Sequence, residues 1–351
     1  MDEKTLLRTM LGIKASMIED VTVYAQIQDA RKMGTNSATS GGDYNLGFHQ
    51  GYIKINDILA NSVYCQVGRF EAYYGRQRIM GLGDWGNRRT YDGVRFGYAG
   101  KKAKFDLLAL KVIDRSFATP SDHRDWVIYG LYGNFWKQHL DLYALCDWDQ
   151  YEKNGYEALK RWTLGTYFNW KGPTGWQADF DAAYQTGTQY DKHLAGYMIA
   201  GESSYQFRNL LKPKLGFGFD LTGGDDGSDT TIIKSFNNMY YSSHTYRGYM
   251  DLFTSTTIAG LMDGFIRFAI DPIKNFTAAV DVHHFQNLEK YTTPDGGTST
   301  ALGQEVDITL RLRYRPGLDL RAGGSTFFAS KDWRPDSDPA FWLYGMITAN
   351  L

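Results

Sequence analysis

The chain has no long apolar run. No stretch approaches the roughly 18 consecutive apolar residues that a membrane-spanning helix requires. Proline is scarce, with 8 residues in 351, whereas glycine is frequent, with 38. Few prolines suit long strands, because each proline removes a hydrogen bond from a β-ladder. We therefore exclude helical membrane insertion, and the composition favours extended, hydrogen-bonded strands.

The chain also has no excess charge of either sign and few cysteines. The 38 Lys and Arg nearly balance the 39 Asp and Glu, which gives no support for nucleic-acid binding. Cys65 and Cys146 are far apart in predicted strands, so we expect free thiols, and no metal-ligand spacing or cofactor motif is present. Residues 1–4 lead directly into a predicted strand instead of a signal peptide, so we expect a processed or trimmed N-terminus.

The stretch 305–314 has the clearest pattern in the chain. Its even-numbered residues from Val306 to Leu312 are bulky aliphatics, and its odd-numbered residues from Glu305 to Arg313 are polar or charged. A period of two indicates a β-strand with two unlike faces. The pattern returns about seventeen times, and aromatics make up 15% of the chain. Such strands predict a transmembrane antiparallel β-barrel around a wet lumen, as a single domain over residues 1–351.

The predicted strands are joined by short and long connections in turn. In bacterial barrels the short turns face the periplasm and the long loops face outward. We predict strands, to within a few residues, at 5–17, 21–31, 44–56, 63–74, 89–100, 103–115, 125–136, 138–149, 156–170, 175–189, 192–206, 212–222, 260–270, 275–287, 302–314, 318–329 and 339–351. We predict long loops at 32–43, 75–88, 116–124, 150–155, 223–259, 288–301 and 330–338.

The odd strand count is informative, because single-chain bacterial barrels generally have an even number. The first predicted strand starts on the long-loop side, and the last one ends on the short-turn side. One interpretation is that a further strand precedes residue 1, which gives about 18 strands. The alternative is that residues 246–257 contain another strand.

The charged parity of each strand must face the lumen, since a charge facing lipid at mid-depth costs about 2–4 kcal/mol. The predicted basic lumen residues are Arg8, Lys14, Lys54, Arg95, Lys111, Arg161, Arg267, Arg311, Arg313 and Arg321. The acids interleaved with them are Asp141, Asp179, Asp181, Glu202, Asp220, Asp281, Glu305 and Asp307.

Two interpretations of these charges stay open. Facing arginines and acids could pair across the wall and keep a wide barrel rigid. Alternatively, an arginine-rich constriction could select anions, since a guanidinium stays charged and grips carboxylates with two hydrogen bonds. As a hypothesis, Arg95, Arg161 and Arg311 carry the selectivity, because each lies on the charged face of a well-phased strand.

A cluster of charged residues lies around the long loop that follows the fourth predicted strand. The cluster consists of Arg76, Arg78, Arg88 and Arg89 with Asp84 and Trp85. The loop could fold inward and present cations at the pore mouth, or it could pack on itself through Arg–Asp pairs.

Three further motifs have modest interpretations. The acidic segment 223–229 lacks the full spacing of a calcium loop, so a solvated loop is favoured. His283 and His284 point to opposite faces of one strand; His283 shares the lumen parity with Asp281, which suggests a hydrogen-bonded wall pair. No nucleophile motif is visible, so we do not expect an enzyme.

Three segments resemble the alginate export family of outer-membrane proteins. The first is VGRFEAYYGRQRIMG at 67–81, followed by DW at 84–85 and RTYDGVR at 89–95. The second is QIQDAR at 26–31 with HQGY at 49–52. The third is FGFDLTGGDD at 217–226, followed by FNNMY at 236–240, His244 and GYMDLF at 248–253. The order and approximate spacing fit over nearly the whole chain.

The resemblance implies an eighteen-stranded barrel with an electropositive pore that passes an anionic polysaccharide. Three features depart from the family pattern: Phe70 stands where Gln is usual, the chain ends on Leu351 instead of an aromatic, and the loops are short. We expect a monomeric channel in the outer-membrane lipid that passes anionic, uronate-type sugars. A polysaccharide exporter would also need a periplasmic partner to supply the chain. A general porin with weak anion preference and a plugged, structural barrel are the alternatives.

Overall fold

The computed structural model describes residues 5–33, 46–83, 88–114, 124–137, 139–254 and 257–350. Within this part of the chain there are 18 strands and one short 3-10 helix, η1 (Ser243–Thr245). The strands are β1 (Leu6–Ile18), β2 (Val21–Lys32), β3 (Leu46–Asn56), β4 (Val63–Phe70), β5 (Tyr91–Ala99), β6 (Ala103–Ile113), β7 (Trp126–Phe135), β8 (Leu140–Lys153), β9 (Tyr156–Lys171), β10 (Trp176–Gln189), β11 (Lys192–Gln206), β12 (Lys214–Thr222), β13 (Ile232–Ile233), β14 (Leu261–Ile273), β15 (Phe276–Thr292), β16 (Thr298–Arg315), β17 (Leu318–Ala329) and β18 (Ala340–Ala349).

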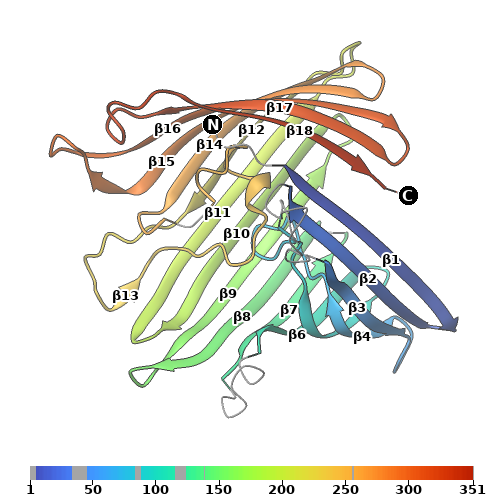
Figure 1. Ribbon diagram of the computed structural model, residues 1–351. Coiled ribbons are helices and arrows are strands. Elements are labelled where there is room, and N and C mark those ends of the chain that lie inside the picture. The colour runs from blue at the N-terminus through green and yellow to red at the C-terminus, as the bar shows by residue number, and fades with distance from the viewer. Residues whose placement is uncertain are drawn as a thin grey trace, which may run out of the picture. The chain divides into compact units, whose positions relative to one another are not determined.

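The chain forms two compact units. The first unit consists of Met1–Leu164, Gly187–Asp191 and Asn238–Ser242, and the second of Gly165–Thr186, Lys192–Asn237 and Ser243–Leu351. In the first unit, β1 to β8 pair antiparallel in chain order. In the second, β11, β12 and β14 to β18 do the same, and Figure 1 shows β14 to β18 side by side.

The strand count confirms the sequence-based prediction of an all-β chain. Every strand except β13 has at least eight residues, and these long strands correspond one to one with the predicted ones. The two-residue β13 pairs parallel with β11 and lies inside the predicted loop 223–259. None of the described residues between 246 and 254 belongs to a strand. The alternative that residues 246–257 contain another strand is therefore not supported over this range.

Two predicted long loops are wrong. Residues 150–153 continue β8, and only Asn154 and Gly155, both at positive φ, make the turn to β9. Similarly, β15 and β16 extend into the predicted loop 288–301. The physical reason is that polar residues at a strand end still pair when both strands project beyond their neighbours, so polarity alone does not mark a loop.

The two faces of each strand differ in exposure, in the reverse of the pattern expected for a water-soluble sheet. In β16, Ile308 is 51% exposed and Leu310 is 40% exposed, whereas Glu305 and Asp307 are 0% and 2% exposed. Similar rows of exposed aliphatic and aromatic side chains occur on the other long strands. We call the exposed row the apolar face and the opposite row the polar face. No helix within the described residues is long and apolar enough to cross a membrane.

A lysine placed on each face of β16 tests this assignment. Ile308→Lys should lower the free energy of unfolding in lipid vesicles by about 2–4 kcal/mol, because the charge would face hydrocarbon. Thr309→Lys, on the polar face of the same strand, is the control and should cost clearly less. Urea titration of the vesicle-inserted protein measures both. Equal costs for the two variants would contradict the face assignment.

Candidate solute pathway

The polar face is the candidate solute pathway, because it carries most of the charged residues that the sequence predicts for a lumen. Strand registers and burial patterns place a residue on this face when it shares the parity of the buried side chains. By this criterion the polar face carries Arg8, Lys14, Lys54, Arg95, Arg161, Asp179, Asp181, Arg267, Glu305, Asp307, Arg311, Arg313 and Arg321.

Lys111 does not lie on the polar face, and its prediction as a lumen residue is wrong. The buried residues of β6 are Asp106, Leu108 and Leu110, which have the opposite parity. Lys111 lies near the strand end, where its ammonium group is 2.8 Å from both Asp114 and Asp125. The prediction took the strand phase from the lysine charge, but local acids satisfy that charge at the rim.

In the first unit an inner ribbon covers part of the polar face. We use this name for residues 71–83 together with 238–242, which are far apart in sequence. Met80 and Tyr240 form a parallel bridge, and the Gly81 amide donates to the Tyr240 carbonyl over 2.8 Å. The Ser242 amide likewise donates to the Gln77 carbonyl over 3.0 Å. Met80 is only 1% exposed, so the ribbon is packed against the strands and is not a free surface loop.

Tyr240 joins the inner ribbon to a buried ion pair. Its hydroxyl donates to Asp147 on β8 over 3.0 Å, and Trp126 Nε1 donates to the same carboxylate over 2.6 Å. Arg161 on β9 lies 3.9 Å from Asp147, and both are at most 6% exposed. Burial raises the pKa of Tyr240 well above its usual value, so the phenol stays a neutral donor. Arg161 therefore neutralises an acid beneath the ribbon.

The arginines of the predicted pore-mouth loop serve mainly to hold that loop in place. Arg89 donates to the carbonyls of Gly81, over 2.8 Å, and of Tyr240, and its guanidinium lies over the Tyr240 ring. Arg78 is 4% exposed, and Arg76 is half-buried. Asp84 and Trp85, which the prediction grouped with them, lie outside the described residues.

Asp106 on β6 is another acid that neighbouring groups enclose. It is 1% exposed and accepts hydrogen bonds from the hydroxyls of Tyr64 and Tyr74, the latter over 2.9 Å. Lys104 Nζ is 3.1 Å from the same carboxylate. Lys54 Nζ lies 4.5 Å from the centre of the Tyr64 ring, so this predicted lumen cation contacts an aromatic face.

Glu71 shares the parity of Arg69, which suggests a local ion pair between them, but Arg69 pairs with Asp92 instead. Glu71 Oε1 lies 2.9 Å from His49 Nε2 and 3.3 Å from Arg88. Arg95 donates to the Glu71 backbone carbonyl over 3.2 Å and stacks over the Phe70 ring. Glu71 follows the end of β4, where the chain turns into the inner ribbon, so strand periodicity could not identify these partners.

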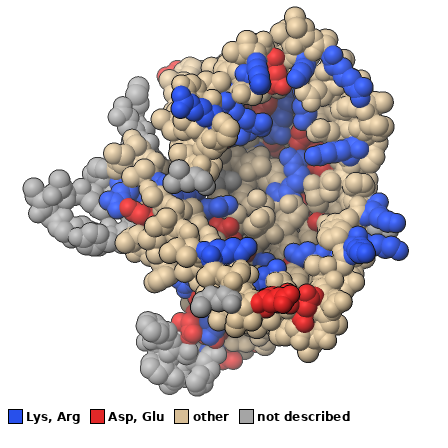
Figure 2. Space-filling view, turned by 90° about the vertical axis from the view of Figure 1, so that its right-hand side faces the viewer, with Lys and Arg blue, Asp and Glu red and all other residues tan. Residues whose placement is uncertain are grey.

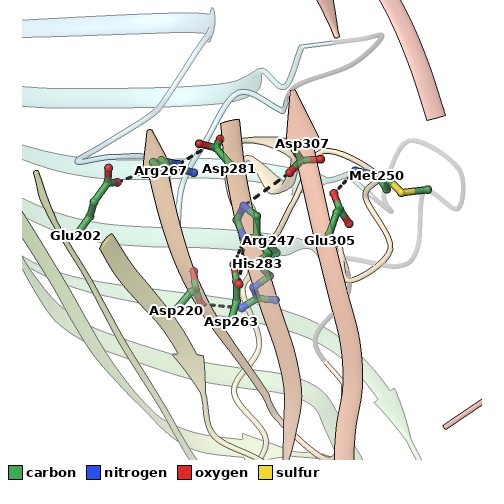
Figure 3. Close-up of polar contacts among 10 residues, drawn as sticks. All are labelled: Glu202, Asp220, Arg247, Met250, Asp263, Arg267, Asp281, His283, Glu305 and Asp307. Carbon is green, nitrogen blue, oxygen red and sulfur yellow. Dashed lines mark hydrogen bonds and ion pairs between the residues drawn. The ribbon is translucent and has the colours of Figure 1, made fainter. Parts of the chain in front are cut away.

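In the second unit, acids from five strands gather on the polar face (Figure 3). Arg267 on β14 lies between Glu202 of β11 at 3.1 Å and Asp281 of β15 at 3.4 Å. His283 Nδ1 is 2.8 Å from Asp263, and its Nε2 is 3.8 Å from Asp307. The predicted wall contact of His283 is therefore made with Asp263 and Asp307 instead of Asp281.

The segment that follows η1 is anchored to these acids. Arg247 is paired with Asp220 of β12 at 3.2 Å, and both are at most 4% exposed. The Met250 amide donates to Glu305 Oε1 over 2.9 Å, as Figure 3 shows. Phe253 then packs into a buried apolar cluster with Leu261, Phe285, Leu302 and Phe327. This segment is held by ionic, backbone and apolar contacts together.

Exposure separates the cations of the polar face from its acids. Asp106, Asp147, Asp263 and Asp307 are 0–2% exposed. By contrast, the side chains of Lys104 and Arg311 are each 37% exposed. Arg8, Lys14 and Arg313 are exposed, and Lys54, Arg95, Arg267 and Arg321 are half-buried. Figure 2 shows lysine and arginine side chains at many places on the viewed face and fewer aspartate and glutamate side chains.

The acidic segment 223–229 is internally satisfied. Asp226 Oδ1 accepts from the Ser228 hydroxyl over 2.8 Å and from Lys234 Nζ over 3.1 Å. Asp229 Oδ1 accepts from the Thr231 hydroxyl and amide. Hydrogen bonds from Ser228, and next the contact with Lys234, lower the pKa of Asp226 to about 2. No group of three metal-ligating side chains is present among the described residues.

The fold is that of outer-membrane β-barrel proteins. Three solved structures from Pseudomonas aeruginosa are similar: OccK11 (OpdR), with TM-score 0.62 and 11% identity; OpdK, with 0.65 and 12%; and OccK8 (OprE), with 0.61 and 15%. They cover 99%, 98% and 99% of this chain and 90%, 92% and 93% of their own. A search of curated protein sequences gave no match.

The sequence profile described as alginate export matches residues 1–337. The chain therefore belongs to the alginate export family, which confirms the resemblance and places the protein in the bacterial outer membrane.

The buried Asp147–Arg161 pair predicts a stability effect. Arg161→Gln leaves the Asp147 charge buried without its cation and should cost about 3–5 kcal/mol of unfolding free energy. The double variant Asp147→Asn with Arg161→Gln removes both charges and should cost less than Arg161→Gln alone. Urea unfolding in vesicles measures both. A double variant that costs as much as Arg161→Gln alone, or more, would contradict the pairing.

The loop 225–234 predicts a pH effect. A carboxyl whose pKa is lowered by folding contributes stability above its unfolded pKa, and this stability is lost as pH falls through the folded value. The Asp226 contacts should thus persist at pH 4 and disappear near pH 2. A carbon-detected NMR titration should give a pKa of about 2 for wild type. Ser228→Ala should raise it, and a wild-type pKa near 4 would contradict the contacts.

Proposed function

We propose that the protein is a passive outer-membrane channel for anionic solutes, in particular uronate-type oligosaccharides or polysaccharides. Membership of the alginate export family supports a channel. One further observation supports the anion preference: on the polar face Asp106, Asp147 and Asp263 are at most 2% exposed and are held by hydrogen bonds or ion pairs, while several cations remain accessible. A chain of net charge −1 can thereby present positive charge to a solute.

The mechanism relies on the accessible cations of the polar face. Lys14 and Arg321 lie on the polar face, and neither has an ion-pair partner within the described residues. A cation near a solute carboxylate lowers the barrier to entry, and the effect is strongest where little water separates the charges. Each contact must stay weak, because a solute held tightly could not leave.

Burial divides the hypothesised selectivity residues into two groups. Arg161 is 6% exposed and lies beside Asp147, so we assign it to the structure of the wall. Arg311 pairs with Asp319 at 3.2 Å but keeps a side chain that is 37% exposed. Arg95 is half-buried against Phe70 and the carbonyl of Glu71. We therefore propose that Lys14, Arg321 and Arg311 contact the solute.

A general porin for small hydrophilic solutes with weak anion preference is the second candidate. One of the similar solved structures is OpdK with vanillate, which is a small aromatic carboxylate. The accessible cations described above would attract such a solute as well. The two candidates share the charge mechanism and differ in whether a sugar chain can pass.

The proposed partners follow from this function. The apolar face contacts outer-membrane lipid, and an anionic carbohydrate contacts the polar face. The predicted monomer, the single domain and a periplasmic partner that supplies a polysaccharide remain predictions. No chemical step is involved, because diffusion down a gradient is sufficient.

Charge reversal tests the proposal. Lys14→Glu with Arg321→Glu should lower the anion-to-cation permeability ratio in a planar bilayer severalfold, because two accessible cations become anions. Lys331→Glu with Lys101→Glu changes the same charge at exposed positions outside the strands and is the control. The same channels are then tested with glucuronate and with glucose in vesicle swelling. An unchanged ratio in the first variant would contradict the role of accessible cations.

A further inference from the structure

A pocket lies at the short-turn end of the second unit, outside the acid cluster of Figure 3. It has a volume of about 480 Å³, which falls within the usual range for a small-molecule site. Its lining comes from three places in the sequence: Leu210, Lys212, Asp271, Pro272, Ile273, Lys274, Asn275, Phe276, Thr277, Arg311 and Arg313.

The pocket is strongly cationic. Lys212, Lys274, Arg311 and Arg313 line it with the single acid Asp271, and Arg311 is also paired with Asp319 at 3.2 Å. Asp271 accepts a hydrogen bond from the Thr277 hydroxyl over 2.7 Å, so part of its hydrogen-bonding capacity is already used within the wall. Within the described part of the chain, no acid forms an ion pair with Lys212, Lys274 or Arg313.

Backbone contacts fix the cationic residues around the pocket. The Asp271 amide donates to the Leu211 carbonyl over 2.8 Å, which joins the β11–β12 turn to β14. The Arg313 amide donates to the carbonyl of Asn275 over 2.9 Å, which joins β16 to the β14–β15 turn. The three lining segments are thus tied to one another, and the clustering of the cations does not depend on the side chains alone.

The pocket belongs to the polar face. Arg311 and Arg313 share the strand parity of Asp307, whereas Leu310 on the opposite parity is 40% exposed. A ligand bound here contacts the aqueous side of the sheet instead of the lipid side. This position favours a soluble anion over a lipid headgroup.

We propose that this pocket is an anion-binding subsite that captures the carboxylates of a uronate-type oligosaccharide at the short-turn end of the pathway. The inference rests on the proposed function. It adds where the sugar first binds and from which side of the membrane it enters. Several cations in one concave site raise the local concentration of an anion and speed its capture by about 10- to 1000-fold. The volume accommodates a short piece of a sugar chain instead of a single carboxylate.

The test compares two variants of equal charge loss. Lys274→Gln with Arg313→Gln removes two charges from the pocket, and Lys101→Gln with Lys102→Gln removes two from an exposed short turn elsewhere. Single channels are recorded in phosphatidylcholine bilayers, with the protein added to one compartment. Oligogalacturonate is then added to each side in turn, and the rate of blocking events is measured. The conductance without oligosaccharide verifies that each variant forms a channel.

The pocket variant should show a block rate about tenfold lower than wild type from one side only, and the control should match wild type. A wild type that oligogalacturonate does not block would overturn the proposed sugar pathway and this subsite with it. A blocked wild type with an identical pocket variant would overturn the subsite alone. If the variant differs from wild type only in bilayers that contain phosphatidylglycerol, the pocket binds a lipid headgroup and the proposal is wrong.

Discussion

The structure depends on one constraint: a strand that crosses lipid must satisfy its backbone within the sheet and keep its charges off the lipid side. The apolar face meets this requirement with rows such as Ile308 and Leu310. Most charged side chains of the strands then lie on the polar face, where Glu305 and Asp307 alternate with those aliphatics along the same strand. The candidate pathway is a direct consequence of this period of two.

The polar face uses its charges in two ways. Buried acids need partners, because an isolated charge away from water is costly. Asp147 accordingly has Arg161, Trp126 and Tyr240, and Asp220 has Arg247. These contacts also anchor chain segments over the sheet. Cations outside such pairs remain accessible, so burial, more than composition, determines the charge that a solute meets.

The sequence predicted the strands and most of the face assignments, because both follow from a local period. It placed Arg161 and Glu305 on the polar face but could not show that they are buried, since the covering segments come from elsewhere in the chain. The bridge between Met80 and Tyr240 joins residues with no common pattern. Lys111 was misplaced because the strand phase was taken from one charge. The cationic pocket was missed because its lining combines two turns with one strand.

The central claim is that accessible positive charge on the polar face makes this channel prefer anions. The most direct measurement is the reversal potential of the wild-type protein in a planar bilayer under a gradient of potassium chloride. The account predicts a reversal potential whose sign shows that chloride permeates faster than potassium. This selectivity should fall as the salt concentration is raised, because the accessible charges are then screened. A reversal potential of the opposite sign, set by potassium, would contradict it.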